Sequence, residues 1–556
     1  MNTDFETALT KTFDVCVVGS GPAGIICALE LARLRPQESI LLIEYGLSDK
    51  PDKRPNGLDE SIQIENPVNH HDPYDCTNKG LGGSSISWGG RCVMYDEVDF
   101  IPRAPFARQC TWSIELFRSI NALADETSGY FECVPGPYNL HGQPDINYRP
   151  IASGFTEGEV TDSCIEKWSL PTRFGKKFCK KLRSTANIHL LFACEARNIP
   201  PPDLQGRVEF IQVRSRKDGR EGKIRARTFV LATGAQEATR LLLKSPAVFA
   251  GRGGVPFSLG KYYQGHLSGK IASVRFTGDP KMTDHGFQRS PSGEYMRRRF
   301  QFPTDVLVTK GIMNTAVWLD NPLYFDPVHK SGPMSFMYLA MITPVLGKCL
   351  APPAVAYSIT KGKRYRLGAH LANLVRDFPK SFWVPALIFF RRYCLRRKLP
   401  GVFLPSAGNV FALHFHAEQE PVEANRMELA EDGETLRLFY GYTDYDAESV
   451  IKAHEHLDSW LQRCGCGALE YWYPREQRAE KIKELSRDGV HQVGTTRISQ
   501  KQDDGVVDVN LKVWGTDNLY VCSSSVFPTS GQANPTFMLG IFALRLARHL
   551  DKNALR

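Results

Sequence analysis

Three glycines and a glutamate near the N-terminus have the spacing of a dinucleotide-binding site. Gly19, Gly21 and Gly24 stand in G-x-G-x-x-G order, and Glu44 follows the last of them by 20 residues. In such a motif the first glycine permits a tight turn, the second admits a pyrophosphate and the third allows close packing of a helix on a strand. A carboxylate at the position of Glu44 can accept both hydroxyls of an adenosine ribose. These residues predict a site for FAD or NAD, and the motif alone does not separate the two.

The segments around these residues have the pattern of one β-α-β unit. Residues 14–18 and 40–43 are short apolar runs, and residues 25–34 between them have the composition of a buried helix. Pro22 and Ala23 lie in the turn where the first strand meets the helix. The N-terminus of that helix presents free N–H groups to phosphates. The unit is therefore complete, with its phosphate-binding turn at the first junction.

Two later segments are typical of chain that runs beside a cofactor. Residues 80–95 read GLGGSSISWGGRCVMY, and their glycine and hydroxyl content predicts a loop rather than a helix. Residues 223–231 predict a strand that leads into the small residues ATGA, and a helical pattern follows at 237–244. Small residues at such a junction let the chain pass under a bound dinucleotide.

Length and composition allow a protein with a large core. A chain of 556 residues with 42% hydrophobic content could hold two to four domains. Its fourteen cysteines are irregularly spaced, and the closest pair, Cys464 and Cys466, has no second pair or histidine beside it, so we expect no zinc site. The first residues show no secretory signal, so we expect a cytoplasmic protein with reduced thiols.

The formal charge of +9 is concentrated in one stretch. Between Lys361 and Lys398 there are eleven Lys or Arg residues and one acid, Asp377, so this basic segment carries +10 and the rest of the chain sums to −1. We therefore expect no nucleic-acid partner. The basic residues surround the apolar run FWVPALIFF, which is too short to span a bilayer, where about 20 residues are needed. This composition fits peripheral contact with an anionic membrane or an acidic partner, and it also fits a helical excursion packed on its own domain.

The order of the motifs along most of the chain resembles that of the glucose-methanol-choline (GMC) family of FAD-dependent oxidoreductases, and the sugar and polyol dehydrogenase and pyranose oxidase branch is the most similar. The segments that carry the resemblance are GSGPAG with Glu44, LGGSSISWGGR at 81–91, VLATGAQEATRLLLKS at 230–245, LGKYYQGH at 259–266, HQVGTTR at 491–497 and LYVCSSSVFPTSGQANPTFM at 519–538.

The resemblance implies an α/β and α+β fold with two domains. A discontinuous Rossmann-like FAD-binding domain would comprise residues 1–100, 165–260 and 486–556. Residues 101–164 and 261–485 would form a substrate-binding domain built on an antiparallel sheet with helices, with the basic amphipathic segment 361–398 inside it.

Two departures from the family pattern refine this expectation. Ala238-Thr239 and Ser245-Pro246 stand where the family's second signature carries other residues, which weakens assignment to the choline or glucose oxidase branch. Ser87 stands where some members have the histidine that is coupled to FAD, so we expect FAD to be bound without a covalent link.

The catalytic residues that the resemblance implies are His491 and Asn534. An imidazole titrates near neutral pH, so His491 can take the hydroxyl proton of an alcohol while hydride passes to flavin N5. Asn534 can hydrogen-bond the substrate oxygen, and as the residue before Pro535 it can also cap the apolar helix 536–550. The implied cofactor residues are Gly19, Gly21, Pro22, Ala23, Gly24, Glu44, Gly82, Gly83, Ser84, Trp88, Arg91, Ala196, Gly234, Ser523, Ser524, Pro535 and Thr536.

Other histidines are harder to interpret from the sequence. His266 matches a family histidine that we interpret as structural. His414 and His416 alternate in a strand-like run, so they would share one face, lining the pocket or pairing with acids, and we expect no bound metal.

The expected reaction is oxidation of an alcohol on a sugar, polyol or glycosylated metabolite, with electrons leaving through an acceptor that the sequence does not identify. Two alternatives stay open. One is a lyase that holds FAD without net redox chemistry. The other is a membrane-surface oxidoreductase that acts on a lipid-linked or sterol-like alcohol through the basic segment.

Overall fold

A parallel sheet forms the half of the molecule that carries the glycine motif. The computed structural model describes residues 2–50, 61–104, 106, 108–142, 148–170, 172–343, 360, 364–395, 397 and 399–554. The parallel strands stand in the order β6-β2-β1-β9-β18 and come from distant parts of the chain. They are β1 (Thr12–Val18), β2 (Ile40–Ile43), β6 (Ile188–Leu191), β9 (Glu221–Leu231) and β18 (Leu519–Val521).

Strand β9 is long enough to join the parallel strands to an antiparallel extension of the same seven-stranded sheet. Its second half pairs with β1 on one side and β18 on the other, both parallel. Its first half pairs antiparallel with β8 (Phe210–Ser215), which in turn pairs with β7 (Cys194–Asn198). Helices α2 (Pro22–Leu34) and α7 (Gly234–Leu243) begin just after β1 and β9, and α16 (Pro535–Ala554) follows β18 along the chain. Helices α2 and α16 pack on each other.

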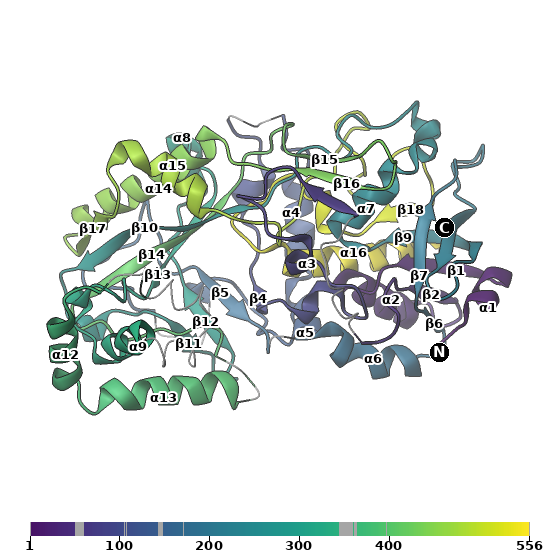
Figure 1. Ribbon diagram of the computed structural model, residues 1–556. Coiled ribbons are helices and arrows are strands. Elements are labelled where there is room, and N and C mark those ends of the chain that lie inside the picture. The colour runs from purple at the N-terminus through teal and green to yellow at the C-terminus, as the bar shows by residue number, and fades with distance from the viewer. Residues whose placement is uncertain are drawn as a thin grey trace.

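A second sheet forms the core of the other half, to the left in Figure 1. Its antiparallel strands stand in the order β13-β14-β10-β17. The strands are β10 (His266–Phe276), β13 (Thr315–Asp320), β14 (Val410–Glu418) and β17 (Gly467–Tyr471). Helices α14 (Asp444–Arg463) and α15 (Arg475–Leu485) pack against this sheet.

Two small sheets connect the halves. In one, β4 (Arg91–Cys92) pairs with β5 (Ile165–Trp168), followed by β12 (Tyr295–Arg298) and β11 (Phe287–Arg289). The other joins β3 (Ile62–Ile64), β16 (Leu436–Phe439) and β15 (Arg426–Leu429). The remaining α-helices are α1 (Phe5–Thr10), α3 (Pro73–Cys76), α4 (Ile114–Asn121), α5 (Ala124–Phe131), α6 (Phe174–Ser184), α8 (Thr304–Lys310), α9 (Gly332–Ile342), α12 (Leu367–Arg376) and α13 (Lys380–Tyr393).

The predicted fold class is confirmed: a Rossmann-like sheet assembled from separate segments adjoins a domain built on an antiparallel sheet. The predicted strands at 14–18 and 40–43 and the helix at 25–34 are present, the helix starting earlier, at Pro22. The segment 80–95 is mostly loop, but it also contains a 3-10 helix, Gly83–Ile86, and strand β4. The proposed domain boundaries stay a prediction.

Packing at Gly24 gives a test of the first β-α junction. A Cβ at this position would lie 1.9 Å from the carbonyl oxygen of Gly19, so α2 would have to move away from the turn. We expect Gly24→Ala to destabilise the flavin-free protein by about 1–3 kcal/mol, the usual cost of overpacking. Gly129→Ala is the matched control, because a Cβ there meets nothing within 4 Å. Thermal unfolding measures both; equal midpoints for the two variants would contradict the packing argument.

Candidate active site

A cavity of about 800 Å³ opens where the parallel strands end. Its wall includes Val18 at the end of β1, Ala232 after β9 and Cys522 after β18, so the carboxyl edge of the sheet forms its floor. His491 and Asn534 lie in the same wall. Ligands of open α/β sheets bind at this edge, so the topology itself places the site here.

Fourteen of the seventeen predicted cofactor residues line this cavity, and three lie behind its wall. Gly24 packs on Gly19. The N–H of Gly82 donates to the carbonyl oxygen of Ser20 at 2.8 Å, and Ser523 Oγ accepts the N–H of Ser525 at 3.3 Å. The lining residues are Gly19, Gly21, Pro22, Ala23, Glu44, Gly83, Ser84, Trp88, Arg91, Ala196, Gly234, Ser524, Pro535 and Thr536.

The cavity wall fits the dinucleotide that the sequence predicts. A Cβ on Gly21 would meet nothing within 4 Å, so bare backbone faces open space there. Thr233 Oγ1 and both amide atoms of Gln236 are buried without a hydrogen-bond partner among the described residues, and both residues belong to the wall. The N-termini of α2, α7 and α16 also meet the cavity, and helix N-termini favour anionic groups such as phosphates.

Glu44 is buried at the cavity wall with its carboxylate already hydrogen-bonded. Oε1 accepts the N–H groups of Gly46 at 2.7 Å and Gly80 at 2.9 Å. Oε2 accepts the N–H of Ser20 at 3.2 Å and the Ser20 hydroxyl at 2.5 Å. The carboxylate thus ties the glycine turn to the loop that begins at Gly80. Its contact with a ribose stays a prediction.

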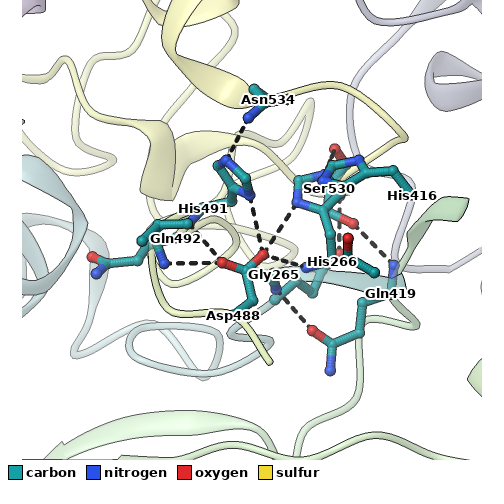
Figure 2. A network of polar contacts seen from close by, with 12 residues as sticks. Gly265, His266, His416, Gln419, Asp488, His491, Gln492, Ser530 and Asn534 are labelled. Atoms are coloured by element: carbon teal, nitrogen blue, oxygen red, sulfur yellow. Dashed lines mark hydrogen bonds and ion pairs between the residues drawn. The ribbon is translucent and has the colours of Figure 1, made fainter. Parts of the chain in front are cut away.

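His491 is held by a contact on each of its ring nitrogens (Figure 2). Nδ1 lies 3.1 Å from Oδ2 of Asp488, and Nε2 lies 2.6 Å from Nδ2 of Asn534. A carboxylate can only accept, so Nδ1 carries the hydrogen and Nε2 keeps a lone pair. The Asn534 amide then donates to Nε2. Nε2 is therefore an acceptor in the cavity wall, as a general base requires, and a substrate hydroxyl reaches its lone pair by displacing the Asn534 amide.

Asp488 is the buried anion that fixes this arrangement. Its Oδ1 accepts the N–H groups of Gly489, Val490 and His491 at 2.7–3.1 Å, and its Oδ2 accepts the N–H of His266 at 2.7 Å. Burial alone would raise the pKa of Asp488, but the charge interaction with His491 and the hydrogen bonds from His491 and His266 hold it well below 3.8. The carboxylate is therefore ionised at any pH at which the protein would work.

Asn534 comes directly before the first residue of α16, as the Asn-Pro pair predicts. Its Nδ2 contacts His491, and its Oδ1 is buried without a hydrogen-bond partner among the described residues. Pro535 and Thr536 follow in the cavity wall. The amide is therefore fixed by the helix start at a point where it can also contact a substrate oxygen.

Two further histidines pack beside His491. His266 on β10 and His416 on β14 stack with ring centroids 4.2 Å apart, and both meet His491 edge to face. Burial lowers the pKa of His266 to about 4 and that of His416 well below 6.5, so both rings are neutral near pH 7. His266 had been expected only to have a structural role, and it also contacts Asp488, with Nδ1 3.4 Å from Oδ2.

The three imidazoles could in principle hold a metal ion, because one nitrogen of each lies within 4.8 Å of the others. Four of the six ring nitrogens already have partners. Both nitrogens of His491 do, His416 Nδ1 donates to the Gln532 carbonyl oxygen at 2.8 Å, and His266 Nε2 contacts the Ser530 carbonyl oxygen at 3.3 Å. The absence of a bound metal stays a prediction.

His414 has a different environment from His416 although both are on β14. Its ring stacks on Trp318 at 4.5 Å, its Nδ1 lies 3.6 Å from Asp320 Oδ2, and its Nε2 contacts the Ser268 hydroxyl at 2.9 Å. His414 thus pairs with an acid in the sheet, whereas His416 contributes to the histidine group. The sequence left both outcomes open.

Arg91 lies on the substrate side of the cavity wall. Its guanidinium forms an ion pair with Glu166 and lies 4.8 Å above the Trp318 ring. Burial lowers its pKa to about 10, although Glu166 acts in the opposite direction. Glu166 also pairs with Arg297, which covers the other part of Trp318 at 4.0 Å. Contact of Arg91 with a phosphate stays a prediction.

Asp488 and the Glu166 cluster were missed by the sequence reasoning. Asp488 stands three residues before His491, a spacing that could have suggested a local contact. Glu166, Arg91 and Arg297 come from three separate segments, and only strand pairing brings them together.

Comparison with other proteins agrees with this geometry. Residues 421–543 match the family model described as GMC oxidoreductase. The 6'''-hydroxyparomomycin C oxidase of Streptomyces lividus is 21% identical over 97% of this chain and 91% of its own. Pyridoxine 4-oxidase from Mesorbium loti has a TM-score of 0.54 at 18% identity, covering 97% of this chain and 99% of its own. An FAD-dependent oxidoreductase from Chaetomium thermophilum has a TM-score of 0.52 at 15% identity, covering 98% and 100%. The two structures share the fold.

The open space beside Gly21 predicts a selective loss of the cofactor. Gly21→Ala adds a methyl group that the empty cavity accommodates, so we expect the free energy of unfolding of the flavin-free protein to stay within about 0.5 kcal/mol of the wild type. The same methyl would occupy the space in which a dinucleotide would approach the backbone, so we expect FAD affinity to fall at least tenfold. Flavin fluorescence titration measures it. Unchanged affinity would show that the dinucleotide does not approach Gly21.

The contact between Asp488 and His491 predicts a change in the rate of flavin reduction. Asp488→Asn keeps an oxygen for the N–H groups that Oδ1 accepts but removes a charge-assisted hydrogen bond worth about 1.5–3 kcal/mol. We expect flavin reduction to slow about 10- to 100-fold, because the positive charge that forms on His491 loses the carboxylate that stabilises it.

A matched control for this variant is Asp508→Asn. Asp508 also accepts two backbone N–H groups, from Asn510 and Lys512, and it does not line the cavity. Equal loss of the flavin reduction rate in the two variants would contradict a specific role of Asp488.

Proposed function

We propose that this chain is a GMC oxidoreductase, a family whose model it matches over residues 421–543, and that it uses FAD to oxidise the CH–OH group of a sugar, a polyol or a glycosylated metabolite. The observation that carries the proposal is the arrangement at His491. Its Nε2 is an acceptor in the cavity wall, its Nδ1 faces the buried carboxylate of Asp488, and the Asn534 amide is 2.6 Å away. A base, a group that stabilises its protonated form and a hydrogen-bond donor thus converge on one point.

The reaction begins when a substrate hydroxyl displaces the Asn534 amide from Nε2 of His491 and binds between the two side chains. The hydroxyl proton moves to Nε2 of His491, and the Asp488 carboxylate stabilises the resulting imidazolium. The Asn534 amide donates to the substrate oxygen and holds it as the carbonyl forms. His266 and His416 stay neutral beside the ring, so they add no positive charge that would oppose its protonation.

Bound FAD would accept the hydride that leaves the substrate carbon, so that the alcohol loses two electrons and two hydrogens in all. The glycine turns at 19–24 and 82–84, the loop around Gly234 and the start of α16 would hold the cofactor. The N-terminus of α16 at Thr536 would favour negative charge on the cofactor by about 0.3–2 kcal/mol. We propose non-covalent binding, because Ser87 in the cavity wall offers no imidazole for a link.

The proposed substrate class has two supports. The cavity wall combines the aromatic rings of Trp88 and Trp168 with the Arg91 guanidinium, surfaces that suit a molecule with several hydroxyls. The relative from Streptomyces lividus is named as an oxidase of a hydroxylated compound, 6'''-hydroxyparomomycin C. The electron acceptor would be identified by reoxidation with oxygen, a quinone or a dye.

Replacement of His491 tests the assignment of the base. We expect His491→Ala to slow anaerobic flavin reduction by about a hundredfold or more, the usual contribution of a positioned general base. His141→Ala is the control, because His141 is an exposed residue paired with Glu157. Stopped-flow absorbance on protein with full flavin content measures the rate, and a rate unchanged in His491→Ala would overturn the assignment.

A panel of alcohols and sugars tests the reaction itself. We expect at least one sugar, polyol or glycoside to bleach the flavin of the wild-type protein under anaerobic conditions. A compound that is converted while the flavin stays oxidised would identify lyase chemistry and contradict the proposal.

Denaturation tests the mode of cofactor binding. We expect acid-precipitated protein to release all its FAD into the supernatant. Yellow colour that stays in the washed precipitate would show a covalent link.

A further inference from the structure

Helices α12 and α13 form the outer edge of the substrate half, at the opposite end of the molecule from α1 and β6 (Figure 1). Both pack on α9, and α12 also contacts the 3-10 helix Pro327–His329. Within the basic segment, Lys361, Lys363, Arg396 and Lys398 lie outside the described residues.

Among the described side chains of these two helices, the fully buried ones are polar, whereas Val384, Leu387 and Ile388 of α13 are apolar and half-buried. The ring of His370 contacts the Ser335 hydroxyl at 3.0 Å and the Phe325 carbonyl oxygen at 3.1 Å. Asn373 donates to the carbonyl oxygen of Pro327 at 3.1 Å, and the Ser381 hydroxyl donates to a carbonyl within the pair. His370, Asn373 and Ser381 are all buried.

The outward side is apolar. On α12 the exposed side chains recur every four residues, at Leu367, Leu371 and Val375, and Val375 is 79% exposed. On α13, Trp383 and Phe390 are seven residues apart, about two helical turns, and therefore share one side. Trp383 is 65% exposed, whereas the partly exposed ring of Phe382 packs against Phe336 of α9. Helix α12 thus has the reverse of the usual pattern, in which the apolar face turns to the core.

Exposed apolar side chains are concentrated here. Nineteen large hydrophobic residues are exposed among the described residues, and nine of them lie between 365 and 390. Single exposed hydrophobics are ordinary on a soluble surface, whereas a contiguous group marks an interaction site. This group is therefore an interaction surface, which we call the α12–α13 face and define by residues 364–391.

Exposed basic residues surround the α12–α13 face. Arg364 and Arg366 precede α12, Lys380 begins α13 and Arg391 lies near its end. The acid in this range, Asp377, is engaged by the Gly332 N–H and by Arg376. The face thus combines aromatic side chains with a net positive charge.

Aromatic side chains ringed by positive charge fit a membrane surface as the partner. Helices that lie in the headgroup region of a membrane carry Trp and Phe on one side, with Lys and Arg around them. Helix α13 is 14 residues long, about 21 Å, and no helix of the described residues has the length and apolarity to cross a bilayer. A second copy would bring the same positive charge to the contact, which opposes self-association.

We propose that the α12–α13 face binds peripherally to the surface of a bilayer that contains anionic phospholipids. The apolar side chains of both helices enter the headgroup region, and the surrounding basic residues contact lipid phosphates. The helices lie parallel to the surface, with their polar sides against α9. The proposal does not depend on the proposed oxidation.

Flotation with vesicles of phosphatidylcholine alone or mixed with phosphatidylserine tests the proposal on the full-length holoprotein. We expect binding to the mixed vesicles that weakens as salt rises from 0.05 to 0.5 M. Lys380→Gln with Arg391→Gln should weaken the partition coefficient about 30-fold, about fivefold for each charge. Trp383→Glu with Phe390→Glu should abolish binding.

Leu204→Glu with Arg207→Glu is the matched control, because it replaces an exposed leucine and an exposed arginine in a loop of the other half. All variants should keep wild-type activity on a water-soluble alcohol. Absence of binding to mixed vesicles would overturn the proposal, as would equal loss in the control. Two other results would also overturn it. One is a dimer that forms without vesicles and that the double variant Trp383→Glu with Phe390→Glu dissociates. The other is binding of an acidic protein to this face with no binding to vesicles.

Discussion

The candidate site depends on one buried carboxylate. Asp488 accepts hydrogen bonds from three consecutive backbone N–H groups of its own loop and from the N–H of His266, where strand β10 begins. Its own backbone N–H donates to the carbonyl oxygen of Asn69, so segments from the beginning, middle and end of the chain meet at this residue. A buried charge is costly unless it is paired and hydrogen-bonded, and these contacts meet that cost. The imidazole of His491 is one of them, so the fold and the chemistry share the same anion.

The nucleotide end of the cavity could be predicted from the sequence because its determinants are local. Gly19 and Gly21 lie in one turn and Gly24 in the first turn of α2, and their types follow from backbone geometry that a short window of sequence already encodes. The same holds for Asn534 and Pro535, whose pairing predicts the start of α16. His491 required the resemblance to a family, because an isolated histidine carries no such local signal.

The substrate end could not be predicted in the same way. Glu166, Arg91 and Arg297 meet through the pairing of β4, β5 and β12, and neither their types nor their spacing encodes that register. His414 and His416 share a strand face, yet one pairs with Asp320 and the other stacks on His266, and these partners come from neighbouring strands. The basic segment was visible as a charge pattern, but only the structure shows that its apolar side faces outward.

The central claim is that Asp488 sets the tautomer of His491, leaving Nε2 as the acceptor for a substrate proton. Nitrogen-15 NMR of protein labelled in histidine measures the tautomer directly at a pH where the ring is neutral. The spectrum of His491→Gln assigns the His491 resonances by difference. The account predicts hydrogen on Nδ1 and a lone pair on Nε2. Hydrogen on Nε2 would contradict it, because the ring could then accept no proton from an alcohol in the cavity.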